Sequence, residues 1–115
     1  MKTNVLVYVP DGLIEDDIVT TVREVLENAT IRFVDSIDAV RATLDSYKDW
    51  AWAVIDMSEE DLTRPELREA FAKNNALPVV LSPPVQDPDV SDWVFLDPPF
   101  SAEMLREALE KTRPH

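Results

Sequence analysis

Carboxylates follow three of the apolar runs in this 115-residue sequence and are the residues best suited to chemistry. Asp56 ends the longest run, 50–55, while Asp11 follows the first run and Asp97 follows the last. In an open α/β sheet these positions, together with Asp35, meet at the carboxyl edge, where ligands bind. A carboxylate there can coordinate a hard cation such as Mg²⁺. The pattern therefore allows a divalent-cation site, with solvated surface carboxylates as the alternative in a chain this acidic.

Composition excludes several other kinds of site. The chain has no Cys, and its one His is His115, so disulfides, thiolate chemistry and Cys/His zinc sites are ruled out. Acidic residues outnumber basic ones by 23 to 11, and a net charge of −12 repels a phosphate backbone. No apolar run approaches the roughly 20 residues that cross a bilayer, and the first residues do not form a signal peptide. We expect a cytoplasmic protein without a nucleic-acid or membrane partner.

Hydrophobic patterning organises the chain as one domain, 1–115, and its 45% apolar content is enough for a core. Strand-like runs alternate with stretches of helical spacing, which is typical of a parallel sheet covered by helices. The predicted strands cover 5–9, 30–35, 50–56, 78–82 and 93–96, and the predicted helices cover 14–29, 36–44, 63–75 and 101–109.

Polar residues and prolines mark the ends of these elements. Ser36 and Ser101 are predicted N-caps, and Thr63 and Glu66 have the spacing of a capping box. The connection 83–92 between the last two strands has only ten residues, three of them proline. It is too short and too rich in proline for an ordinary crossover helix. We expect the fourth helix to be absent or reduced to one turn.

Five strand–helix units, Asp56 at the end of strand three, and Pro99-Phe100-Ser101 before the last helix resemble the CheY-like receiver domain of two-component response regulators. The resemblance covers nearly the whole chain. It implies a three-layer α/β sandwich, flavodoxin-like, with a five-stranded parallel sheet in the order 2-1-3-4-5. It also implies that Asp56 occupies the phosphoacceptor position.

Other positions depart from the receiver pattern. Receivers hold Mg²⁺ with acidic residues just after strand one, where this sequence has Val9 and Pro10. Asp11, which remains close by, aligns with a less essential position. Receivers also have a Lys before the Pro-Phe pair of strand five, and Pro98 stands there instead. The metal and the cation that offset phosphoryl charge are therefore expected to be weak or missing.

Two further residues complete a remnant acidic pocket around Asp56 and Asp11. Asp97 adds a negative charge beside the missing Lys, which opposes formation of an acyl phosphate. The hydroxyl residue expected after strand four is uncertain in alignment, because Ser82 comes one position early. These departures resemble pseudo-receivers, which act as phosphorylation-independent interaction modules.

We therefore expect a non-enzymatic signalling module that binds protein and needs no cofactor. The first alternative is a single-domain response regulator phosphorylated at Asp56 with Mg²⁺, and a more distant one is an acidic divalent-cation-binding domain that uses Asp11 and Asp56. Asp97-Pro98-Pro99-Phe100 also looks like a motif of amino methyltransferases, but Gly12 is the only glycine and cannot supply their glycine-rich turn.

The partner surface is expected between strand four and the last helix. Without a fourth helix, Trp93 and Phe95 lose cover on the sheet, and exposed apolar surface marks interaction sites. The receiver family uses this region for dimerisation and output, so Pro99 and Phe100 are included. The predicted partner is another protein or a second copy of the chain.

The tryptophans of the third predicted strand are expected to lie on one face of the sheet. Trp50 and Trp52 are two residues apart, which in a regular strand places them together, with Ala51 and Ala53 on the opposite face. Trp52 is predicted to belong to the core.

Overall fold

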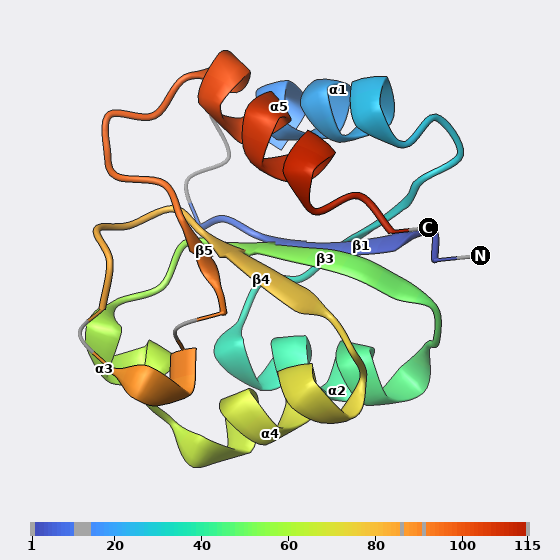
Figure 1. Cartoon of the computed structure of the whole chain (residues 1–115). Coiled ribbons are helices and arrows are strands. Elements are labelled where there is room, and N and C mark those ends of the chain that lie inside the picture. The colour runs from blue at the N-terminus through green and yellow to red at the C-terminus, as the bar shows by residue number, and fades with distance from the viewer. Residues whose placement is uncertain (1, 11–14, 86, 91, 115) are drawn as a thin grey trace.

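The computed structural model describes residues 2–10, 15–85, 87–90 and 92–114. It contains a five-stranded parallel sheet in the order β2-β1-β3-β4-β5 with helices on both faces, which confirms the predicted three-layer α/β sandwich (Figure 1). The strands are β1 Asn4–Tyr8, β2 Thr30–Phe33, β3 Trp50–Ile55, β4 Leu77–Val80 and β5 Val94–Phe95.

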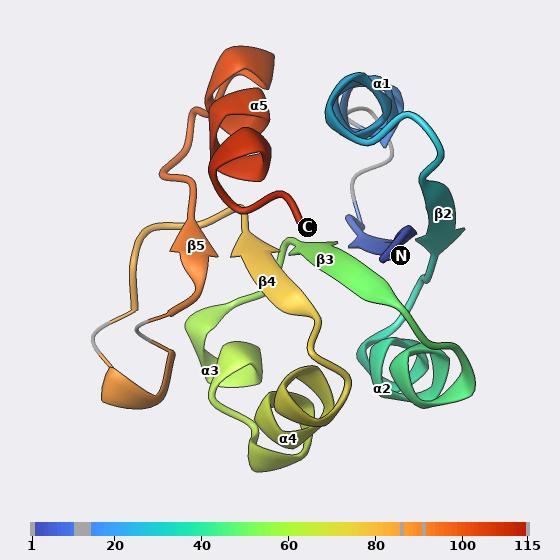
Figure 2. The same ribbon diagram turned by 45° about the vertical axis from the view of Figure 1, so that its right-hand side comes forward.

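The helices divide between the two faces of the sheet (Figure 2). One face, called the α1/α5 face below, is covered by α1 and α5, and the other, the α2/α4 face, is covered by α2, α3 and α4. The helix bounds are α1 Glu15–Val25, α2 Ile37–Ser46, α3 Glu59–Leu62, α4 Pro65–Lys73 and α5 Ala102–Lys111. None of the helices in the described ranges is long and apolar enough to cross a membrane.

The sheet separates two apolar clusters. Val5, Val7 and Val54 pack with α1 and α5 on one side, while Leu6 and Ile55 pack with α2, α3 and α4 on the other. All six residues of β3 are buried, as its central place in the sheet requires. The β-branched and aromatic run that identified this strand is therefore explained by burial on both faces.

A β-bulge in β3 overturns the predicted placement of its tryptophans. Asn4 of β1 pairs with Trp50, but the next residue, Val5, pairs with Trp52, so Ala51 is an extra residue in the ladder. Trp50 consequently belongs to the α2/α4 cluster and Trp52 to the α1/α5 cluster, and both are fully buried. The prediction that they share a face was wrong because it assumed unbroken alternation, whereas core burial of Trp52 is confirmed.

The ends of the helices bear out part of the capping analysis. The Ser36 hydroxyl accepts from the Ala39 N–H at 3.1 Å, and the Ser101 hydroxyl accepts from the Met104 N–H at 3.1 Å, so both predicted N-caps are confirmed. The predicted capping box was wrong. Thr63 is the C-cap of α3, a short helix that the sequence did not reveal, and α4 begins at Pro65.

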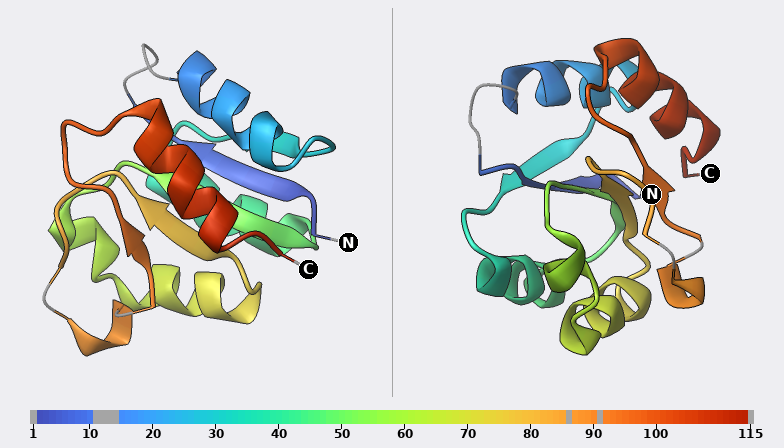
Figure 3. Two further views of the ribbon diagram at one scale, coloured as in Figure 1. Left: turned by 45° about the horizontal axis from the view of Figure 1, so that its top comes forward. Right: turned by 90° about the vertical axis from the view of Figure 1, so that its left-hand side faces the viewer.

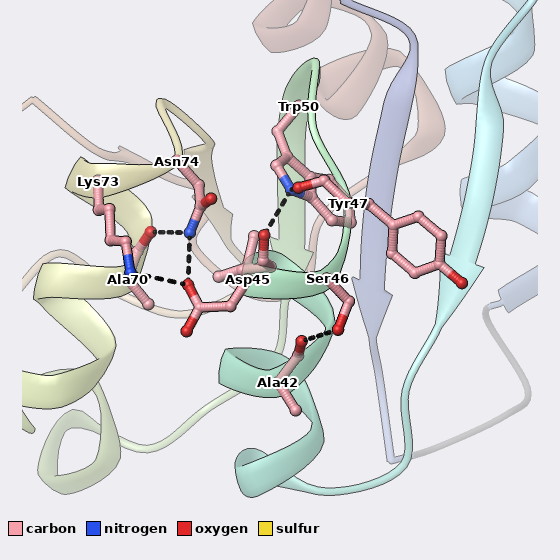
Figure 4. Close-up of polar contacts among 9 residues, drawn as sticks. Ala42, Asp45, Ser46, Tyr47, Trp50, Ala70, Lys73 and Asn74 are labelled. Atoms are coloured by element: carbon pink, nitrogen blue, oxygen red, sulfur yellow. Dashed lines mark hydrogen bonds and ion pairs between the residues drawn. The ribbon is translucent and has the colours of Figure 1, made fainter.

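Polar contacts fix α2 against α4 and β3 (Figure 4). The Asp45 carboxylate accepts from the Asn74 amide at 3.1 Å and lies 3.7 Å from the Lys73 ammonium, so it joins the ends of the two helices. The Trp50 indole N–H donates to the Leu44 carbonyl at 3.1 Å and the Tyr47 carbonyl at 3.2 Å. A buried indole thereby satisfies carbonyls that the end of α2 leaves without helical partners.

The connection from β4 to β5 contains one three-residue 3-10 helix, Pro88–Val90. This confirms that the fourth helix of the resemblance is reduced to a single turn. The turn packs on the α2/α4 face, where Val90 is buried. The predicted last strand was too long, since β5 pairs over only two residues.

Candidate functional site

The carboxyl edge of the sheet brings together the ends of β3, β4 and β5. The Asp56 N–H donates to the Tyr8 carbonyl at 2.9 Å, which continues the pairing of β1 and β3 by one residue. Leu81 and Leu96 continue the neighbouring ladders in the same way, at 2.9 Å to Ile55 and 2.8 Å to Val80. Asp56, Ser82 and Asp97 therefore follow their strands at this same edge.

The carboxylates at this edge are exposed and have no polar partner in the part of the chain that is described. Asp56 and Asp97 have neither an ion pair nor a side-chain hydrogen bond there. The Ser82 hydroxyl donates to the adjacent Pro83 carbonyl at 3.2 Å. Asp11, the fourth residue of the predicted pocket, lies outside the described residues. Asp56 thus stands at the end of β3 with no ion-pair partner among the described residues.

The described residues at this edge do not supply the acidic ligands that a magnesium ion needs. Receivers hold the metal with an acidic pair after strand one, and here those positions are Val9, which is buried, and Pro10. Within the described ranges no group of three or more Asp, Glu or His side chains could hold a metal ion. Asp11 and Asp56 as metal ligands, and the cation-binding domain built on them, gain no support from the described residues.

The four residues predicted to bind a partner do not form one surface. Trp93 and Phe95 are partly buried on the α2/α4 face, where Trp93 meets Phe71 edge-on with ring centroids 5.4 Å apart. Phe100 packs partly against the α1/α5 cluster, and Pro99 is exposed. The sequence expectation of an uncovered sheet face overlooked how closely the short connection packs there.

An apolar groove lies between β5 and α5 and was not found from the sequence. It has a volume of about 310 Å³ and is lined by Val94 of β5, by Leu96 just after β5, and by residues of α5 and its C-cap. Met104, 37% exposed, is one of three large apolar side chains that the described surface exposes. The lining residues of α5 are Met104, Glu107, Ala108 and Lys111, and the C-cap residue is Thr112.

The residues of α5 that line the groove lie next to the residues that face the core, and the core-facing pattern is the stronger of the two in the sequence. Leu105 and Leu109 point to the core. Met104, Ala108 and Lys111 form a second stripe at helical spacing beside it. This second stripe forms a groove only because β5 lies beside α5, and the sequence alone does not show that β5 lies there.

No protein-family model matches this sequence, and no curated protein matches it either. Solved structures do. SdrG from Pseudomonas melonis Fr1, in a BeF3-activated conformation, has a TM-score of 0.65 and 22% identity over 94% of this chain and 93% of its own. A response regulator receiver domain protein from Bacillus halodurans C-125 has a TM-score of 0.72 and 14% identity over 100% of both chains. The chain has the receiver-domain fold.

The receiver-domain fold does not by itself assign an activity. A de novo designed Rossmann 2x3 protein has a TM-score of 0.60 and 14% identity over 100% of this chain and 97% of its own. A designed protein can therefore have much the same architecture. What this receiver-like chain does has to be argued from its own edge carboxylates and its own groove.

Proposed function

We propose that this chain is a non-enzymatic, receiver-like signalling module that binds protein without being phosphorylated. The observation that carries the proposal is the carboxyl edge, where Asp56 remains but has no cation beside it in the described ranges. An acyl phosphate on Asp56 needs positive charge to offset its own. Asp97 follows β5, the edge strand beyond β4, and adds a negative charge at this edge, and Pro98 replaces the expected Lys.

The groove between β5 and α5 supports protein binding beside the β5 edge of the sheet. It combines apolar side chains in its floor with exposed charged residues on α5, which is the arrangement of interaction surfaces. It lies in the region from strand four to helix five where the sequence analysis expects a partner surface, but it uses Val94, Leu96 and Met104 in place of Trp93 and Phe95. Those residues are the partner surface that we propose.

A second copy of the chain is the proposed occupant of this groove. Glu107 and Lys111 lie one turn apart on the same side of α5 and carry opposite charges. When two copies of α5 pack antiparallel across a two-fold axis, each Glu107 faces Lys111 of the other copy. Ala108 lies between them and allows the two helices to approach closely.

Sedimentation of charge variants tests this dimer. Glu107→Lys places two positive residues opposite each other, so the dimer is expected to weaken by about tenfold or more. The double variant Glu107→Lys/Lys111→Glu restores the complementarity and is expected to recover dimerisation. Glu110→Lys is the matched control, because Glu110 is exposed on the same helix but does not line the groove.

A purely monomeric wild-type chain across the concentration range would contradict the dimer. So would a double variant that sediments like Glu107→Lys alone, because the predicted contact is symmetric in the two charges.

A response regulator phosphorylated at Asp56 is the second candidate function. It is favoured by one observation, the exposure of Asp56 at the end of the central strand β3. Phosphoryl transfer from a small donor in the presence of Mg²⁺ distinguishes the two candidates, since only this one requires an adduct at Asp56.

A further inference from the structure

The described residues of the connection from β4 to β5, which are 82–85, 87–90 and 92–93, are tied to α4 by two pairs of side chains. Arg68 and Asp87 form an ion pair, with side chains only 20% and 25% exposed. Phe71 and Trp93 meet edge-on, with ring planes at 80°. Arg68 and Phe71 are three residues apart, so both contacts come from one side of α4.

These described residues, called the strap below, are joined to one another by backbone hydrogen bonds. The Val90 N–H donates to the Asp87 carbonyl at 3.2 Å, and the Trp93 N–H donates to the Val90 carbonyl at 3.1 Å. Val90 is 1% exposed, so the single turn has a buried anchor. Figure 3 shows the strap on the same side of the sheet as α3 and α4. Arg68 is held in place on that side by a further contact to the Leu62 carbonyl at 3.4 Å.

The strap leads directly into β5, and β5 forms one wall of the groove on the opposite face. Side chains alternate across a strand. Trp93 and Phe95 accordingly pack on the α2/α4 face, while Val94 and Leu96 line the groove beside α5. β5 pairs with β4 over only two residues, so its backbone ladder is short. Contacts of the strap with α4 therefore help to set the position of Val94 and Leu96.

We propose that Arg68 and Phe71 are positioning residues for the groove and that the strap holds the groove in one preset shape. One part of this inference rests on the proposed function: contacts on the far face of the sheet would regulate partner binding at the groove. The other part, that the strap holds the groove in shape, does not depend on any partner. Neither Arg68 nor Phe71 lines the groove, so an effect of either residue on binding has to pass through the strap and β5.

Hydrogen exchange and sedimentation of one set of variants test the proposal. Arg68→Gln is expected to speed exchange of the Val90 and Trp93 amides about tenfold, because it removes a charge-assisted contact that holds the strap closed. The matched control is Arg64→Gln, which removes the Arg64–Glu66 ion pair, 2.8 Å long, from the same helix and leaves the strap untouched. Exchange in β1 and β3 reports whether a variant has lost global stability instead.

The dimer gives the second readout. Arg68→Gln is expected to weaken dimerisation severalfold, Arg64→Gln to leave it unchanged, and the exchanged pair Arg68→Asp/Asp87→Arg to recover part of the protection. The proposal is overturned if the wild-type strap amides exchange as fast as an open loop, or if Arg68→Gln acts no more strongly than Arg64→Gln. If the wild type is monomeric, the proposed dimer fails, while the exchange data still decide whether the strap is closed.

Discussion

The indole N–H of Trp52 donates to the hydroxyl of Thr112 at 2.9 Å and so connects the central strand β3 to the C-terminal end of α5. The Thr112 hydroxyl in turn donates to the Ala108 carbonyl at 2.8 Å. Trp52 is fully buried, so its N–H has no access to water. This chain of two hydrogen bonds fixes the helix that forms one wall of the groove.

Replacing Thr112 by Val is expected to destabilise the fold by about 1–2 kcal/mol, because the buried Trp52 N–H loses its acceptor. The measurement is urea unfolding followed by circular dichroism. Thr112→Ser keeps the hydroxyl and should lose much less.

Thr63→Val is the control for that substitution. The Thr63 hydroxyl donates to the Glu60 carbonyl at 2.9 Å in an exposed position, where water can replace it. If Thr112→Val and Thr63→Val cost the same, the contact with Trp52 contributes nothing beyond a surface hydrogen bond.

Deleting Ala51 is expected to cost about 4 kcal/mol or more, or to prevent folding. The bulge at this residue allows Trp50 and Trp52 to reach opposite faces, and a shift of one residue moves a side chain to the other face of the sheet. Ala51→Gly keeps the residue count and should be far milder. A deletion variant that unfolds at the wild-type urea concentration would show that the bulge is unimportant.

The stability of the fold is expected to depend on pH through Glu66. Hydrogen bonds from its own backbone and from Arg64 hold the pKa of Glu66 below its ordinary value. The folded state therefore favours the ionised carboxylate. The stabilisation is present above the pKa of the unfolded chain and is lost as pH falls through the folded pKa.

Comparison of the wild type with Glu66→Gln measures this effect. The wild type should have the higher melting temperature at neutral pH, and the difference should shrink as the solution becomes acid, to nothing once Glu66 is protonated. If the difference in melting temperature stays the same at every pH, the effect of the substitution comes from side-chain shape or helix propensity rather than from charge.

The five strands and the helices α1, α2, α4 and α5 could be predicted from the sequence because local patterns determine them, while the strand order came from the resemblance. The run 50–55 is apolar on both faces because β3 is central, and Ser36 and Ser101 begin helices because their hydroxyls accept from nearby backbone N–H groups. The resemblance also placed Asp56 at the carboxyl edge, where it lies. These features depend on residues close together in the chain.

Features that depend on distant residues could not be predicted. The bulge at Ala51 is a relationship between β3 and β1, and the pairing of Arg68 with Asp87 joins a helix to a connection of no regular pattern. Partial burial of Trp93 follows from its contact with Phe71. The groove could not be predicted because it depends on the positions of both β5 and the second stripe of α5 in the folded chain.

The most direct test of the central claim is intact mass after incubation with Mg²⁺ and acetyl phosphate, with Asp56→Asn as control. SdrG, which was solved in a BeF3-activated conformation, can be treated in parallel as a receiver with an activated state. Sedimentation of the same samples reports the dimer. We expect no phosphoryl adduct on this chain and the same dimerisation with and without the phosphoryl donor. A phosphoryl adduct that disappears in Asp56→Asn and changes dimerisation would contradict it and identify a phosphorylation-driven switch.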